Sequence, residues 1–290
     1  MDVYAIVTEK IINLLESGVV PWRRPWSSTG LPRNLVSKKP YKGVNYFLLS
    51  ASKYVSPFWL TYRQATELGG HVRKGEESTI VIFWKAEHVT RSSEALEVEE
   101  TDDKNRRRFL LRFYRVFNLE QCDLRQSVLD KLPKIETHQH EPIESAERII
   151  ANMPNPPEIQ YAGSKAFYSP MTDRITLPPR ELFSSAEEFF GTLAHEASHA
   201  SGHPKRLNRE SIADAAPFGS PTYSFEEIVA EMSAAYLCAE AGISPAVIDN
   251  EAAYIQDWLK KIRSEKRLVV IAAAQAQRAA DYILNRASTK

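Results

Sequence analysis

The stretch Leu193-Ala194-His195-Glu196-Ala197-Ser198-His199-Ala200 decides how the second half of this chain is interpreted. Its two histidines are four residues apart, so on a helix they lie on one face and both imidazoles can reach a single metal ion. Glu196 follows the first histidine and is placed to take a proton from water bound to that ion. The stretch therefore predicts a metal-dependent hydrolytic site.

The residues around this motif predict the helix that its chemistry needs. Ser184 or Ser185 can serve as the N-cap, with a glutamate three residues later, and Gly202 is a suitable stop. Apolar residues recur at helical spacing, namely Phe189, Phe190, Leu193, Ala194, Ala197 and Ala200. The alternative is a buried helix with two hydrogen-bonded core histidines, but Glu196 has no apolar purpose in such a helix.

A third ligand is expected from the next helical segment, Ser224 to Leu237. A catalytic zinc site has three protein ligands and one open position for water. Glu227 and Glu231 are four residues apart and share a face. We expect Glu227 to bind the metal and Glu231 to accept the outer N–H of a ligating histidine. The reverse assignment stays open, and so does a capping box formed by Ser224 and Glu227.

Three further histidines are weaker ligand candidates. His203 would need the helix to continue through Gly202, so it ranks below Glu227. His138 and His140 lie in a polar segment and are expected to be solvated.

Several stretches outside the metal motif carry a family resemblance. In the first half they are PWRRPW (21–26), KPYKGVN (39–45), WLTYRQA (59–65), GGHVRKGE (69–76), FWK (83–85) and YRVFN (114–118). Near the end they are AYIQDWL (253–259) and AQAQRAADY (274–282). The H-E-x-x-H helix followed by a glutamate on the next helix resembles the gluzincin metallopeptidases. The whole chain resembles the ArdC-type antirestriction proteins of conjugative plasmids.

This resemblance implies an α+β fold of two domains: a small N-terminal domain that binds single-stranded DNA and a mostly helical, zincin-like (gluzincin) metallopeptidase domain. It implies protection of incoming plasmid DNA from host restriction, with one Zn²⁺ or another divalent ion held by His195, His199 and Glu227. A host protein is a candidate substrate of the metal site. The alternative is a DNA-binding protein that acts by shielding alone, with a metal that is structural or not needed.

The distribution of charge favours an anion-binding first half, although the formal net charge is zero. From Gly18 to Lys85 there are 11 basic and 3 acidic residues, whereas after residue 125 there are 17 basic and 22 acidic residues. No helix-turn-helix, zinc finger or RNP-like string occurs, so we expect sequence-tolerant binding of single strands by stacking and backbone charge. The candidate DNA-binding residues are Trp22, Arg23, Arg24, Trp26, Lys38, Lys39, Tyr41, Lys42, Arg73 and Lys74. The alternative for the tryptophans is packing in the core.

Hydrophobic periodicity predicts the order of the main elements. The first half contains helices over 2–17 and about 61–68, and strands over 79–89 and 106–117 joined by a hairpin tip at 91–104. Short strands at 158–161, 166–168 and 174–177 precede the metal helix, and closing helices span about 250–264 and 267–286. An edge strand of that small sheet could hold an extended peptide. We place the domains at 1–125 and 143–290, with a polar linker at 126–142.

The cysteines and the apolar runs favour a cytoplasmic protein with no membrane partner. Cys122 and Cys238 are far apart and in no C-x-x-C motif, which argues against a disulfide framework and a thiolate metal site. No basic-then-apolar signal peptide opens the chain. The longest apolar run, Leu268 to Ala274, is too short to span a bilayer.

Overall fold

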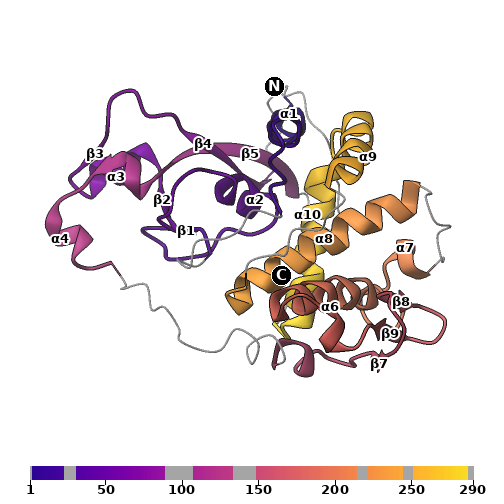
Figure 1. Ribbon diagram of the computed structural model, residues 1–290. Helices are drawn as coiled ribbons and strands as arrows, with labels where there is room; N and C mark the ends of the chain where they lie inside the picture. The colour runs from indigo at the N-terminus through magenta and orange to yellow at the C-terminus, as the bar shows by residue number, and fades with distance from the viewer. Residues whose placement is uncertain are drawn as a thin grey trace.

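The computed structural model describes residues 2–22, 31–88, 107–132, 148–213, 221–243 and 251–286. The first half holds α1 (Val3–Glu16), β1 (Arg33–Asn34), α2 (Val44–Ser50), β2 (Phe58–Leu60), α3 (Tyr62–Glu67), β3 (His71–Val72), β4 (Thr79–His88), β5 (Arg107–Asn118), β6 (Cys122–Asp123) and α4 (Gln126–Leu129), with a 3-10 turn at Leu119–Gln121. The second half holds β7 (Glu158–Tyr161), β8 (Phe167–Ser169), β9 (Arg174–Leu177), a 3-10 turn at Arg180–Leu182, α6 (Ala186–Ser201), α7 (Glu210–Ala213), α8 (Pro221–Ala241), α9 (Glu251–Ser264) and α10 (Leu268–Ile283). Figure 1 shows the two halves side by side.

The first half is built on a four-stranded sheet with the order β1-β2-β5-β4. β1 and β2 are parallel, and the other neighbours are antiparallel, with Thr79 opposite Val116 at one end of the long β4–β5 pair. Helix α2 packs on β4, where the Asn45 side chain bonds both the N–H and the C=O of Ile82 at 2.7 Å. These bonds satisfy a buried amide and fix the helix on the strand.

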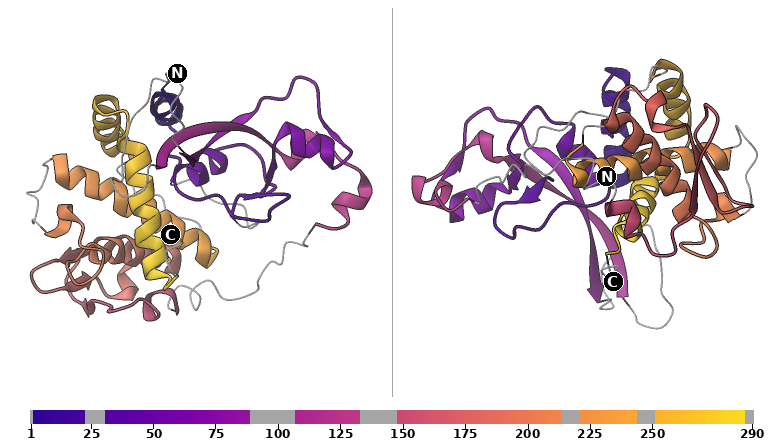
Figure 2. Two further views of the ribbon diagram at one scale, coloured as in Figure 1. Left: turned by 180° about the vertical axis from the view of Figure 1, so that it is seen from behind. Right: turned by 60° about the horizontal axis from the view of Figure 1, so that its bottom comes forward.

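The second half is a small sheet with helices beside it. β9 lies in the middle, parallel to β7 and antiparallel to β8. Helix α6 packs against this sheet and against α8, and α10 lies across both helices (Figure 2, left). All the short strands predicted for this region are present.

The two domains share one hydrophobic core. Val7, Ile11 and Leu15 on one side of α1 are buried in the same cluster as the apolar residues of α8 and α10. Helix α1 lies beside α9, from the far end of the sequence (Figure 1). The expected α+β fold of two domains is confirmed by the separate sheets of the two halves, and these halves pack together on a common core.

Polar contacts around Gly43 also join the halves. Its N–H donates to Gln277 at 3.2 Å, and its carbonyl accepts from the Tyr236 hydroxyl at 2.8 Å. With φ at +59° and ψ at −145°, this residue adopts a backbone conformation that essentially only glycine tolerates. The adjacent Lys42 forms an ion pair with Asp281 of α10 at 3.1 Å.

Three expectations differ from the structure or lie partly or wholly outside the described residues. The capping box of Ser224 and Glu227 is wrong, because α8 already begins at Pro221, a residue well suited to a first helical turn. The first part of the expected linker forms α4, and Leu132 packs on the first-half cluster around Leu60. The rest of that linker and the hairpin tip at 91–104 fall outside the described residues. Among the helices described, none is long and apolar enough to cross a bilayer.

Candidate metal centre

Helix α6 begins and ends where its sequence predicts. The Ser185 side chain accepts a bond from the Glu188 N–H at 3.1 Å, and the Glu188 carboxylate bonds back to Ser184. At the other end Gly202 is the C-cap with φ at −78°, so left-handed freedom is not the reason for glycine. A Cβ there would lie 2.9 Å from the Arg209 guanidinium carbon, so any larger residue would have to displace Arg209.

The last turn of α6 is tied to the small sheet by Arg206. Its guanidinium donates to the Ala200 carbonyl at 2.6 Å and to the Asn155 carbonyl at 2.9 Å. It also forms an ion pair with Asp173, in the turn between β8 and β9, and bonds the Tyr168 hydroxyl at 3.2 Å. The side chain is almost fully buried. Arg206 therefore holds the end of the helix that carries both histidines.

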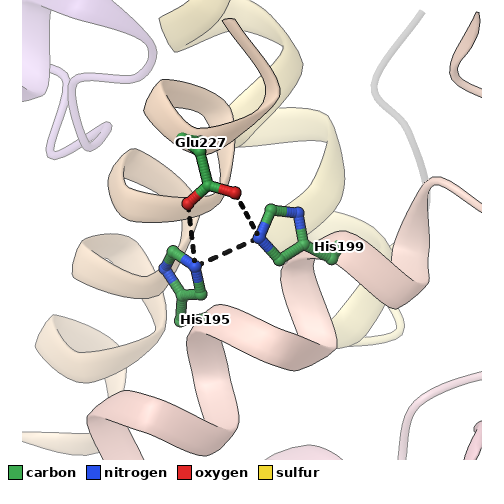
Figure 3. A group of neighbouring side chains, drawn as sticks. All are labelled: His195, His199 and Glu227. Carbon is green, nitrogen blue, oxygen red and sulfur yellow. Dashed lines mark hydrogen bonds and ion pairs between the residues drawn. The ribbon is translucent and has the colours of Figure 1, made fainter. Parts of the chain in front are cut away.

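Three side chains converge beside α6. His195 Nε2 and His199 Nε2 lie 3.1 Å apart, and the Glu227 oxygens lie 3.5 Å and 3.4 Å from them (Figure 3). Ligands held at ~2.0–2.1 Å by a tetrahedral zinc ion are about 3.3 Å apart. The three donors therefore fit one divalent ion. His203 is not in this group; its ring faces Asp173 instead, at 3.9 Å.

The donor group is partly exposed to solvent. The side chains of His195 and Glu227 are 20% and 24% exposed, whereas that of His199 is 11% exposed. A catalytic site needs water at the position that the protein does not fill. Glu196 is next to His195 on the same helix and is largely buried.

Two carboxylates lie behind the histidines. A Glu231 oxygen is 3.9 Å from His195 Nδ1, on the nitrogen that does not face Glu227. A Glu226 oxygen is 3.4 Å from His199 Nδ1. Both positions suit a carboxylate that orients a ligating imidazole. The sequence pattern predicts Glu231 in this role but not Glu226, whose only signal in the sequence is its place beside Glu227.

Glu226 is held by a buried polar network. Arg209 forms an ion pair with it, and the Ser211 hydroxyl bonds its other oxygen. Arg209 also donates to the Ser201 hydroxyl at 2.8 Å and to the Ser198 carbonyl at 2.7 Å, both on α6. The network therefore connects α6, α8 and the segment between them.

The surroundings of the site shift the pKa values of Glu226 and His195. Burial alone would raise the pKa of Glu226, but its bonds to His199 and the Arg209 guanidinium outweigh burial and lower the pKa to about 2. Burial alone would lower the pKa of His195, but Glu227, Glu196 and Glu231 raise it to about 9. A cation entering the site therefore displaces a proton.

The structure corrects two of the expected DNA-binding residues. Trp22 is 1% exposed, with its ring centroid 6.2 Å from that of Phe47 and 5.2 Å from that of Trp258. Tyr41 is 6% exposed and packs under Phe83. Neither ring can stack on a base, because apolar side chains already cover both.

Of the other expected DNA-binding residues, some are already engaged. Arg73 forms ion pairs with Glu76 and Asp123, and Lys42 is paired with Asp281. The side chains of Lys38, Lys39 and Lys74 are exposed. Arg23, Arg24 and Trp26 fall outside the described residues.

Comparison with known proteins covers both halves. A model of the N-terminal domain of anti-restriction factor ArdC matches residues 1–117, and a zincin-like metallopeptidase model matches residues 144–275. A solved structure of the antirestriction protein ArdC from plasmid R388, free of metal, is 34% identical, covers 98% of this chain and 97% of its own, and has a TM-score of 0.74. This chain belongs to the ArdC antirestriction family. The Mn(II)-bound structure of the R388 protein is 33% identical, with coverages of 100% and 99% and a TM-score of 0.75.

Other relatives of this ArdC-family chain include the protein y4eC of Sinorhizobium fredii (strain NBRC 101917 / NGR234). It is 36% identical over 97% of this chain and 91% of its own length. The DNA primase TraC of Escherichia coli is 35% identical over 97% of this chain but only 20% of its own length. The family fold can therefore form part of a much longer protein.

Proposed function

We propose that this protein protects incoming DNA from restriction by binding single strands through its first half, and that its second half is a divalent-metal peptidase. The convergence of His195, His199 and Glu227 in a chain of the ArdC family is the observation that carries the proposal. The Mn(II)-bound R388 structure supports a divalent ion in this fold.

The enzymatic half of the proposal assigns a role to each side chain. His195, His199 and Glu227 hold the ion, which we take to be Zn²⁺. These residues would hold a divalent ion that, when bound, would supply Lewis-acid chemistry and lower the pKa of a bound water towards about 7. Glu196 takes the proton of that water and passes it to the leaving group. Glu231 and Glu226 orient the two imidazoles from behind.

The DNA-binding half draws on charge and on exposed side chains. The region from Gly18 to Lys85 has 11 basic and 3 acidic residues. Lys38, Lys39 and Lys74 are exposed there and remain proposed phosphate contacts. A single strand offers both phosphates and unpaired bases, whereas a duplex hides its bases.

Equilibrium binding to matched single-stranded and duplex oligonucleotides tests the DNA half. We expect tighter binding to the single strand, with log affinity falling by about 0.7 per phosphate contact as log salt rises. A preference for duplex, or an affinity that salt does not change, would overturn this half of the proposal.

Plasmid transfer into a restricting host tests how protection works. If a host protein is cleaved, Glu196→Gln should abolish protection while metal stays bound. If DNA is only shielded, Glu196→Gln should protect like the wild type, and replacing Lys38, Lys39 and Lys74 together should abolish protection. Shielding alone is the second candidate function. It is favoured by the basic first half, whose residues are distinct from those of the metal site.

A further inference from the structure

The β4–β5 hairpin has two faces with different surroundings. Residues directly opposite on antiparallel strands point to the same side, so the register assigns each residue to a face. On one face Ile80, Ile82 and Leu111 pack into the main core, and the Trp84 ring contacts Tyr4 of α1. That face packs the two domains together, although Trp84 and Phe113 on it remain 49% and 36% exposed.

The other face covers a small cluster and then extends beyond it. Val81 and Val116 are buried there with Tyr41, Leu49 and Trp59. Further along the strands the same face presents Phe83, Arg112 and Tyr114. We name these three residues the aromatic stripe. The right-hand view of Figure 2 shows the two long strands that carry it.

The stripe exposes two aromatic rings that are held in place by paired strands and by a buried ring beneath them. Phe83 is 46% and Tyr114 is 42% exposed, although both belong to a regular part of the sheet. They form a diagonal cross-strand pair, with ring centroids 5.7 Å apart and planes inclined by 64°. Beneath Phe83 the buried Tyr41 ring lies 6.2 Å away. The two exposed rings are thus oriented before any ligand arrives, and each can offer a face to a different base.

The charges around the stripe match a polynucleotide. Arg112 is directly opposite Phe83, and this face carries no acidic residue within the segments 79–83 and 112–116, whereas Arg115 is on the other face. Stacked bases with a cation beside them are the common means of binding single strands without sequence preference. A duplex would present only its phosphates to such a surface, leaving both rings exposed to water.

We propose that Phe83, Tyr114 and Arg112 form the surface on which single-stranded DNA stacks. The inference depends on the proposed DNA-binding function and adds the site of binding. That site contains none of the loop residues expected from the sequence. It gives the stacking role of the buried Trp22 and Tyr41 to two exposed rings on the hairpin.

The test is binding of the full-length protein to a labelled oligothymidylate of about 20 nucleotides, longer than the site of a typical single-strand-binding fold. Phe83→Ala and Tyr114→Ala should each weaken binding by about five- to 150-fold. Arg112→Gln should lower the slope of log affinity against log salt by about 0.7.

Matched controls come from the second domain. Phe167 and Tyr161 are 50% and 49% exposed, which is similar to the exposed fractions of Phe83 and Tyr114. Phe167→Ala and Tyr161→Ala should therefore change the DNA affinity by less than about twofold if stacking is local to the stripe. A Phe83→Ala/Tyr114→Ala double variant that binds like the wild type would overturn the stripe and leave the DNA-binding function standing. A wild type that fails to bind the oligonucleotide would overturn both.

Crosslinking locates the contact even if a variant folds poorly. Irradiating the wild-type protein with an iododeoxyuridine oligonucleotide should yield adducts at Phe83 or Tyr114, located by peptide mass spectrometry. Adducts confined to other segments would contradict the stripe. So would a double variant that loses protection but keeps its DNA affinity, because that result would assign the stripe to a protein partner.

Discussion

The carboxylate of Glu226 lies 3.4 Å from His199 Nδ1, while Glu227, the next residue, faces Nε2 of the same ring at 3.4 Å. Two adjacent glutamates therefore contact one imidazole from opposite nitrogens. The turn of α8 that carries the proposed metal donor also carries the carboxylate on the other side of the ring. Such an arrangement fixes both the tautomer and the direction of the ring.

Glu226→Gln should weaken divalent-cation binding by about ten- to 100-fold, because the anionic partner of the histidine is lost. The affinity is measured by titration with Zn²⁺ or Mn²⁺ against a chelator of known strength. The matched control is Glu187→Gln, an exposed glutamate on α6, which should bind the cation like the wild type. Equal affinities for all three proteins would contradict an orienting role for Glu226.

Arg209→Gln should destabilise the protein by about 3–5 kcal/mol, because it leaves the Glu226 carboxylate buried without its guanidinium. Both side chains of this pair are less than 10% exposed. Arg263 pairs with Glu16 at the surface, with side chains 56% and 45% exposed, so Arg263→Gln should cost less than about 1 kcal/mol. Urea unfolding measures the loss of stability in each variant. Similar midpoints for the two variants would argue against a stabilising role for the buried network.

Trp22→Ala should cost about 3–5 kcal/mol of unfolding free energy, since it empties a site between Phe47 and Trp258 in the shared core. Phe83→Ala removes a half-exposed ring from a cross-strand pair and should lower the unfolding free energy by less than about 1 kcal/mol. Trp22→Ala should therefore mainly lower the stability, whereas Phe83→Ala should mainly lower the DNA affinity. A stable Trp22→Ala protein that has lost DNA binding would restore the stacking role expected from sequence.

Both cysteines should resist alkylation in the folded protein. Burial raises the pKa of the Cys122 thiol to about 11 and that of Cys238 to about 12. Only the thiolate reacts, and at pH 8 a thiol with a pKa of about 11 is ionised in about one molecule per thousand. Mass spectrometry after brief iodoacetamide treatment should therefore show no adduct until denaturant is added. Rapid labelling of the native chain at Cys238 would place α8 outside the core.

The metal helix could be predicted closely because its signals are local. Ser185 and Gly202 bound α6 in the structure as in the sequence, and the spacing of its histidines needs only helical geometry. The strands at 158–161 and 174–177 likewise follow from short apolar runs between turn residues.

What the sequence did not reveal depends on contacts between distant residues. The Arg209–Glu226 pair joins residues 17 apart, and only the folded chain shows that Arg209 approaches Gly202. Trp22 packs against Trp258, which is more than 200 residues away in the sequence. The local sequence around Trp22 therefore could not show whether its ring is buried or exposed. The exposed face of β4 and β5 could not be chosen either, since apolar residues occur on both sides of these strands.

The central proposal is one divalent ion held by His195, His199 and Glu227, and equilibrium dialysis with metal analysis measures the number of ions bound per chain. We predict one ion per wild-type chain and a loss of binding in Glu227→Ala and in His199→Ala. Circular dichroism should show that both variants keep the fold. Full occupancy in both variants, or no ion bound by the wild type in excess Zn²⁺ or Mn²⁺, would contradict the assignment.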